Sequence, residues 1–190
     1  MTTTATSTEL LQALHDPAAG AWGLFVGRYR PLIESFAMRA GLSVDDARDV
    51  AQNALLAFYS SYRDGAYDRE RGRLRSWIFG IARHQLGRAL RGRRRGPYSL
   101  DEAGELCDAD AEAIWESAWQ RELLLAALSR AREEVEPVTF EAFELFAVAG
   151  VPSHVVAQSL GLSENAVYGA KRRVLARLRA LHAELSERFE

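Results

Sequence analysis

The chain has 190 residues, 48% of them hydrophobic, and a formal net charge of −2, which is enough chain for one ordinary domain or two small ones. Its single cysteine, Cys107, excludes an internal disulfide and a cysteine-rich zinc site. Because the chain has no run of about eighteen apolar residues and its N-terminus lacks the basic-then-apolar order of a secretory signal, we expect a reduced, cytoplasmic protein without membrane insertion.

The first long helix is predicted over residues 16–40. Asp16 and Pro17 supply an N-cap and a first-turn proline, and Gly41 can end the helix in a left-handed conformation. Residues 1–15, before this helix, are predicted to be an N-terminal extension. The expected apolar face of the helix consists of Trp22, Phe25, Val26, Tyr29, Leu32, Ile33, Phe36 and Ala37.

Two further helices are predicted in the first half of the chain, over residues 43–62 and 74–92. Ser43 followed by Asp46 resembles a capping box with aspartate in place of glutamate, so it marks the start of the first of these helices. A turn over residues 63–72 separates the two helices. The second is expected to turn its arginines outward and to bury Leu74, Trp77, Ile78, Ile81, Ala82 and Leu86.

Charge is strongly segregated along the chain. Residues 63–95 contain eleven arginines against three acidic residues, whereas residues 97–118 contain seven acidic residues and no basic one. The last helix is basic again. This order predicts two nucleic-acid-facing units joined by a solvated acidic linker over residues 96–110.

The second domain is predicted over residues 111–190. One helix carries Trp115 and Trp119, and Pro137 begins another, since proline is favoured in a first helical turn. No strand is predicted anywhere. The expected fold is therefore all-α, with two small helical bundles, residues 16–95 and 111–190, joined by the flexible acidic linker.

Residues 151–179 have the pattern of a helix-turn-helix. Pro152 can occupy the first turn of one helix, Gly161 can end that helix, and Ser163 can cap the next. The inner faces are expected to bury Val155, Val156 and Leu160 in the first helix and Val167, Val174, Leu178 and Leu181 in the second. The outward residues of the second helix are Asn165, Tyr168, Arg172 and Arg173. A basic second helix after a glycine turn favours a DNA-reading unit, with an ordinary helical hairpin as the alternative.

Three segments, in this order, resemble the extracytoplasmic-function (ECF) group of bacterial RNA polymerase sigma factors. Residues 45–52, DDARDVAQ, are similar to region 2.2 of that family, and residues 67–83, YDRERGRLRSWIFGIAR, are similar to region 2.3. Residues 151–179 resemble region 4.2. The resemblance implies a sigma factor that binds core RNA polymerase, through its β′ and β subunits, and promoter DNA. Region 2 would open and hold the −10 element, and region 4 would read the −35 element.

The same resemblance implies three groups of candidate site residues. Those expected to bind polymerase are Asp46, Asp49, Gln52 and Asn53. Those expected at the −10 element are Tyr67, Arg69, Arg71, Arg75, Arg83, His84, Arg88 and Arg91. Those expected at the −35 element are Asn165, Tyr168, Lys171, Arg172 and Arg173. Among the aromatic residues, Tyr67 is the expected stacking platform for a base, whereas Trp77 is expected in the core.

The sequence departs from the family at two positions of the expected docking helix, where Arg48 and Asn53 replace acidic residues. This change removes negative charge from the surface that would meet polymerase. Some relatives with such losses regain charge by phosphorylation, and Ser60 and Ser61 are the nearest hydroxyls. An anti-sigma factor or a kinase is therefore a candidate regulatory partner.

Other classes of function explain less of the sequence. The four histidines are scattered, and neither a metal-binding spacing nor a glycine-rich phosphate loop is present, so we expect neither an enzyme nor a cofactor. A one-component helix-turn-helix regulator with an N-terminal sensing bundle, or a module that binds only proteins, would leave the arginine-rich third helix unexplained. A sigma factor requires core polymerase for its promoter activity, whereas a regulator would bind promoter DNA without it.

Overall fold

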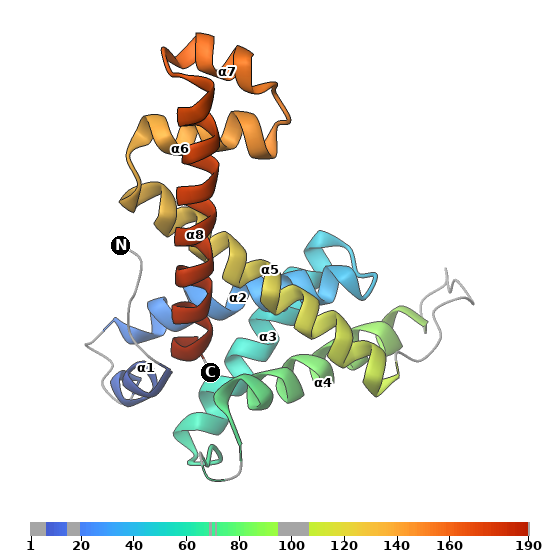
Figure 1. The fold of residues 1–190 in the computed structure, drawn as a ribbon. Helices are drawn as coiled ribbons and strands as arrows, with labels where there is room; N and C mark the ends of the chain where they lie inside the picture. Colours follow the sequence, from blue (N-terminus) through green and yellow to red (C-terminus); the bar gives the residue numbers. More distant parts are fainter. Residues whose placement is uncertain (1–6, 15–19, 69, 71, 95–106, 190) are drawn as a thin grey trace. The chain divides into compact units, whose positions relative to one another are not determined.

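The computed structural model describes residues 7–14, 20–68, 70, 72–94 and 107–189, and these residues contain helices and no strand (Figure 1). The all-α prediction is confirmed. The described chain divides into two compact units, the first extending through Glu122 and the second covering Leu123–Glu187.

The first unit is built around three helices, α2 (Ala21–Arg39), α3 (Val44–Arg63) and α4 (Leu74–Arg94). Helix α3 packs against both α2 and α4, and the short α1 (Ser7–Ala13) packs on α2 (Figure 1). The phenol of Tyr62 donates a 2.6 Å hydrogen bond to the carbonyl oxygen of Leu11, which joins α1 to the end of α3. The core therefore lies between the apolar faces of these helices, as helical periodicity requires.

Aromatic rings fill much of this core. Phe25 on α2 stacks on Phe58 of α3 with ring centroids 4.2 Å apart, and Phe58 also stacks on Tyr62 at 5.8 Å. Tyr29 and Phe36 are completely buried on the same face of α2. Because such ring pairs add about 0.5–1.5 kcal/mol beyond the area that they bury, this cluster is a main source of stability in the first unit.

The helix ends of the first unit follow the predicted local signals in part. Gly41 has φ +92 after the end of α2, and Ser43 accepts a 3.2 Å hydrogen bond from the backbone N–H of Asp46 at the start of α3. The hydroxyl of Ser43 also donates to the Asp46 carboxylate at 2.6 Å. Helix α2 begins at Ala21, after Gly20 in a left-handed conformation, and the expected start at residues 16–17 lies outside the described residues.

The second compact unit begins at Leu123, twelve residues after the predicted start of the second domain at Ala111. Helix α5 (Asp108–Glu134) begins inside the predicted linker, and its first half packs on the first unit. Trp115 is buried there, with its ring edge-to-face against Phe36 and 5.4 Å from the ring of Phe79. This aromatic contact joins the first half of α5 to the first unit. The remainder of the linker, residues 96–106, lies outside the described residues.

The second unit contains the end of α5, α6 (Pro137–Phe143), a π-helical segment η3 (Glu144–Val148), α7 (Ser153–Leu160) and α8 (Glu164–Phe189). Pro137 occupies the first turn of α6, as predicted. The sequence pattern did not distinguish η3 from a continued α-helix. A small apolar core joins these elements, formed by Ala142, Val156, Ala157, Val167 and Ala170.

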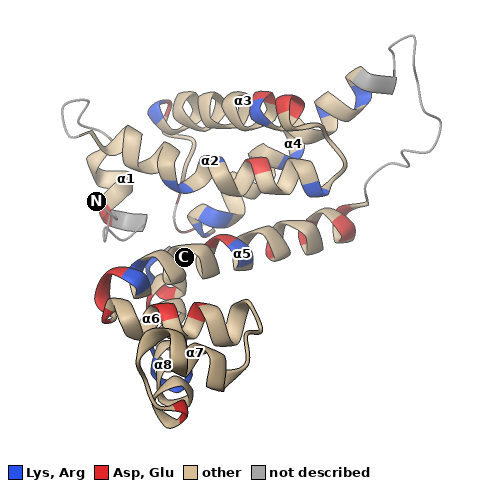
Figure 2. Ribbon diagram, turned by 90° about the horizontal axis from the view of Figure 1, so that it is seen from above, with Lys and Arg blue, Asp and Glu red and all other residues tan. Residues whose placement is uncertain are grey.

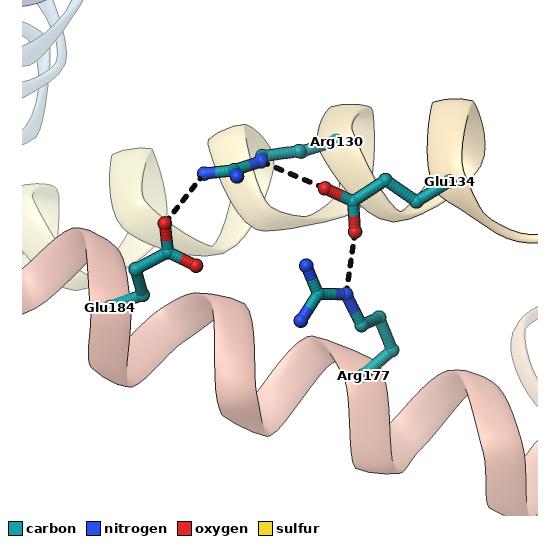
Figure 3. Close-up of polar contacts among 4 residues, drawn as sticks. All are labelled: Arg130, Glu134, Arg177 and Glu184. Atoms are coloured by element: carbon teal, nitrogen blue, oxygen red, sulfur yellow. Dashed lines mark hydrogen bonds and ion pairs between the residues drawn. The ribbon is translucent and has the colours of Figure 1, made fainter. Parts of the chain in front are cut away.

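A chain of ion pairs joins α5 to α8 in the second unit (Figure 3). Arg130 contacts the carboxylates of Glu134 and Glu184, each at 3.0 Å, and Arg177 donates to Glu134 at 2.5 Å. The hydrogen bonds from Arg177 and Arg130 lower the pKa of the Glu134 carboxyl. Exposed ion pairs contribute about 0.2–1 kcal/mol each, and these pairs, which are partly exposed, add modestly to the apolar packing.

We expect Glu134→Gln to remove a pH-dependent part of the stability of the second unit. A carboxylate with a lowered pKa contributes stability above the ordinary glutamate pKa, and this contribution is lost as the pH falls through the lowered value. The difference in stability between the unchanged protein and the variant should therefore be largest near neutral pH and shrink on acidification. Urea denaturation followed by circular dichroism at several pH values measures it.

Glu133→Gln is the matched control, because Glu133 is an exposed neighbour on the same helix with the same charge. Added salt should also reduce the effect of Glu134→Gln, since the pairs are solvent-accessible. An identical pH profile for the two variants would show that the ion pairs of Glu134 add no stability.

Candidate nucleic-acid interface

The outer face of α3 carries the residues predicted to bind polymerase. Asp49, Gln52 and Asn53 are exposed at the spacing of one helical face, and Leu56 continues the same stripe with 56% of its surface exposed. Asp46 is half-buried and contacts the cap residue Ser43. Sequence reasoning missed Leu56, although its position seven residues after Asp49 was a usable signal. The face thus combines a carboxylate, two amides and one apolar side chain.

A cleft of about 680 Å³ lies between α3 and α4 in the first unit. It is lined from α3 by Asp46, Asp49 and Asn53, and from α4 by Arg88 together with Gln85 and Gly92. The structure therefore brings three predicted polymerase-binding residues and one predicted DNA-binding arginine to a single cleft. Sequence reasoning did not connect these two groups, because the residues of α3 and α4 are distant along the chain.

Helix α4 divides the predicted DNA-binding residues between two faces. Arg75 and Arg83 flank Phe79 at four-residue steps, on the side of α4 that contacts the first half of α5. His84, Arg88 and Arg91 point to roughly the opposite side of α4, because each residue turns the helix by about 100°. His84, Arg88 and Arg91 are exposed. Arg69 and Arg71 lie outside the described residues.

Arg75 is largely enclosed. Its side chain is 17% exposed, its guanidinium group pairs with the Glu116 carboxylate, and it lies 4.6 Å from the ring centroid of Trp119. Burial by itself raises the pKa of the Glu116 carboxyl, but hydrogen bonds from Gln120 and Arg75 outweigh it and lower the pKa overall. Arg75 is thus held by an ion pair and a cation–π contact together.

Arg83 pairs with Asp108, the first residue of α5. The hydrogen bond from Arg83 lowers the pKa of the Asp108 carboxyl, and the same bond raises the pKa of the Arg83 guanidinium. Further along α5, Arg39 of α2 donates a 3.2 Å hydrogen bond to the hydroxyl of Ser117. Arginines from two helices therefore hold the first half of α5.

The turn before α4 presents an aromatic pair. The ring of Tyr67 stacks on that of Trp77 with centroids 5.0 Å apart, and Trp77 also contacts Phe58 at 5.0 Å. Both Tyr67 and Trp77 are half-buried, so Trp77 is not fully in the core as expected. The pair thus forms a partly accessible aromatic surface that is anchored to the core through Phe58.

Helices α7 and α8 of the second unit are joined by a short turn. Gly161 ends α7 with φ +65, and Ser163 accepts a 3.2 Å hydrogen bond from the backbone N–H of Ala166 at the start of α8. Two details correct the sequence expectations. Pro152 precedes α7 instead of lying in its first turn, and Val155 is exposed, because its neighbour Val156, about 100° away around the helix, faces the core.

The outward side chains of α8 differ in whether other elements hold them in place. Asn165, Lys171, Arg172 and Arg173 are exposed, as is Tyr168. The Tyr168 hydroxyl, however, lies 3.2 Å from that of Ser153, and its ring meets Phe146 edge-on at 5.1 Å. Ser153 in turn donates a 2.6 Å hydrogen bond to Glu164. Tyr168 is therefore fixed by α7 and η3, and the sequence missed its partners because they lie on other elements.

In a comparison with known families, part of the first unit matches a family model. The family model Sigma-70 region 2 matches residues 25–96, which contain most of α2, all of α3 and α4, and less than half of the chain. No curated protein matches the chain significantly. In the part of the chain that the structure describes, no helix combines the length and apolar character that a membrane crossing requires. Residues 25–96 are thus similar to sigma-70 region 2, and this match supports a sigma-70 family factor.

Proposed function

We propose that the chain is a sigma factor of the ECF group that binds core RNA polymerase and directs promoter-specific initiation. The observation that carries the proposal is the region 2 match over residues 25–96. These residues include both the polar outer face of α3 and the arginines of α4. Members of the sigma-70 region 2 family bind core polymerase and promoter DNA, which are the two partners that such surfaces suit.

Polymerase docking is assigned to the outer face of α3. The Asp49 carboxylate can accept charge-assisted hydrogen bonds, while the amides of Gln52 and Asn53 can both donate and accept. Leu56 adds an apolar contact beside them. Arg48, one of the two departures from the family pattern, pairs with Asp45 at 3.2 Å.

Capture of the opened −10 strand is assigned to α4 and the turn before it. Single-stranded DNA binding combines a cationic surface with aromatic platforms, each stacked base contributing about 1–3 kcal/mol. Arg88 and Arg91 supply an accessible cationic face beside the exposed His84, and Tyr67 on Trp77 supplies the platform.

The second unit is proposed to act as region 4, with α8 reading the −35 element. Arg172 and Arg173 are exposed and suit phosphate or guanine contacts. Tyr168, which contacts α7 and η3, helps to hold α8 in place.

We further propose that the protein is not an enzyme and uses no cofactor, and that an anti-sigma factor or a kinase controls it. Ser60, which is exposed, is a better kinase target than the half-buried Ser61.

Run-off transcription with core polymerase on a promoter library tests the proposal. Transcripts should start at defined sites only when the protein and core polymerase are both present, and the selected promoters should reveal both elements. A protein that shifts promoter duplex strongly without polymerase, and directs no transcription with it, would instead be a one-component helix-turn-helix regulator.

We expect Arg172→Ala to weaken transcription from the selected promoters by about tenfold, because one good base contact contributes roughly 1–3 kcal/mol of discrimination. Affinity for core polymerase should be unchanged, since the proposed docking face lies on α3. Arg179→Ala is the matched control, with the same loss of charge at an exposed position two turns later on α8. Loss of polymerase binding in Arg172→Ala would place the docking surface on α8.

A further inference from the structure

We propose that the first half of α5 is an internal anionic ligand of α4, which withholds Arg75 and Arg83 from DNA in the free chain. The inference rests on the proposed function, because it concerns access to the proposed −10 surface. It adds a regulatory element that the polarity of the linker alone does not reveal. Three contacts between α4 and α5 carry it.

The contacts between α4 and α5 follow one another in reverse order along the two helices. Arg75 meets Glu116, Phe79 meets Trp115, and Arg83 meets Asp108. As the residue numbers increase along α4, the numbers of their partners on α5 decrease, so the two segments run antiparallel. Acidic positions recur along α5 from its first residue (Figure 2). The result is an apolar centre with an ion pair on either side.

Carboxylates here occupy the positions that phosphate oxygens would take. Arginine binds both groups through the same planar donors, so one guanidinium cannot give its full set of hydrogen bonds to both. For Arg75 the competition is steric as well, since Trp119 and Glu116 leave only 17% of its side chain exposed. A phosphate can reach Arg75 only after α5 has moved away.

The two ion pairs differ in how strongly each one keeps its arginine from binding DNA. The Asp108 side chain is 85% exposed, so salt and water screen its pair with Arg83. Glu116 is more enclosed and also accepts a 2.8 Å hydrogen bond from Gln120. Glu116 is therefore the stronger block, and the exposed face of His84, Arg88 and Arg91 is what remains for DNA in the closed state.

Equilibrium binding of a fluorescein-labelled single-stranded oligonucleotide to the full chain, followed by anisotropy at two salt concentrations, tests the proposal. Glu116→Gln should lower the dissociation constant at least fivefold, and Asp108→Asn about twofold, because each change releases an arginine. Glu112→Gln should change it by less than a factor of 1.5. It removes the same charge one turn before Glu116, at an exposed position with no ion pair among the described residues.

The outcomes separate the two proposals. If Glu116→Gln and Asp108→Asn behave like Glu112→Gln, any gain reflects net charge alone and the internal-ligand proposal is wrong. Because the Asp108 side chain is exposed, Asp108→Asn keeps the test decisive even if Glu116→Gln unfolds. Run-off transcription with the unchanged protein and core polymerase is measured in parallel. The absence of transcripts would contradict the sigma-factor proposal. Tighter oligonucleotide binding by Glu116→Gln would still support the internal-ligand proposal.

Discussion

Phe58→Ala is expected to lower the free energy of unfolding of the first unit by about 3–5 kcal/mol, the range for removing a large aromatic side chain from a packed core. Phe58 is 1% exposed, and its ring contacts those of Phe25, Tyr62 and Trp77. These rings come from α2, α3 and α4, so the substitution leaves a cavity where all three helices meet.

Urea denaturation followed by tryptophan fluorescence measures this effect, since all four tryptophans lie in the first unit. Leu56→Ala is the control, because Leu56 lies on the same helix but is 56% exposed, and it should change stability by no more than about 0.5 kcal/mol. Equal losses in the two variants would mean that Phe58 is not packed as the structure has it.

Asp49→Arg is expected to weaken binding to core RNA polymerase by at least tenfold, and transcription with it. The substitution reverses the charge at the centre of the exposed face formed by Asp49, Gln52, Asn53 and Leu56. Like charges brought together across an interface are strongly unfavourable, so the effect should exceed that of simply losing one contact. Fluorescence anisotropy of the labelled protein with core polymerase measures it.

Glu141→Arg provides the control for this experiment. It makes the same change of charge at an exposed position on α6, in the second unit. Tryptophan fluorescence should show that Asp49→Arg remains folded, because the position is exposed. If a folded Asp49→Arg protein bound polymerase with unchanged affinity, the proposal that α3 is the docking helix would be wrong. The charge-restoring variant Asn53→Glu should act in the opposite direction and strengthen binding.

Residues close together in the sequence determined much of the first unit. The hydrogen bonds of Ser43 with Asp46 mark the start of α3, and Gly41 marks the end of α2, because caps depend on neighbours within one turn. The same holds for Gly161 and Ser163 in the second unit. Helical periodicity likewise placed Phe25, Phe36, Val167 and Val174 in the core.

Adjacent apolar residues show the limit of this local reasoning. Val155 and Val156 have the same chemistry, but only Val156 is buried. The sequence pattern places Trp115 in the second domain, yet its ring packs against Phe36 and Phe79 of the first unit. Composition and periodicity indicate that such residues prefer burial, but they do not indicate which surface will bury them.

The sequence by itself determined the helical class, several of the caps, most of the core faces and a resemblance to sigma factors that the region 2 match supports. Only the tertiary structure decided which arginines of α4 are accessible. Arg75 and Arg88 have the same side chain on the same helix, but Glu116, 41 residues away along the chain, encloses Arg75 and leaves Arg88 exposed. The physical reason is that capping and periodicity are local, whereas accessibility depends on the distant element that packs on each face.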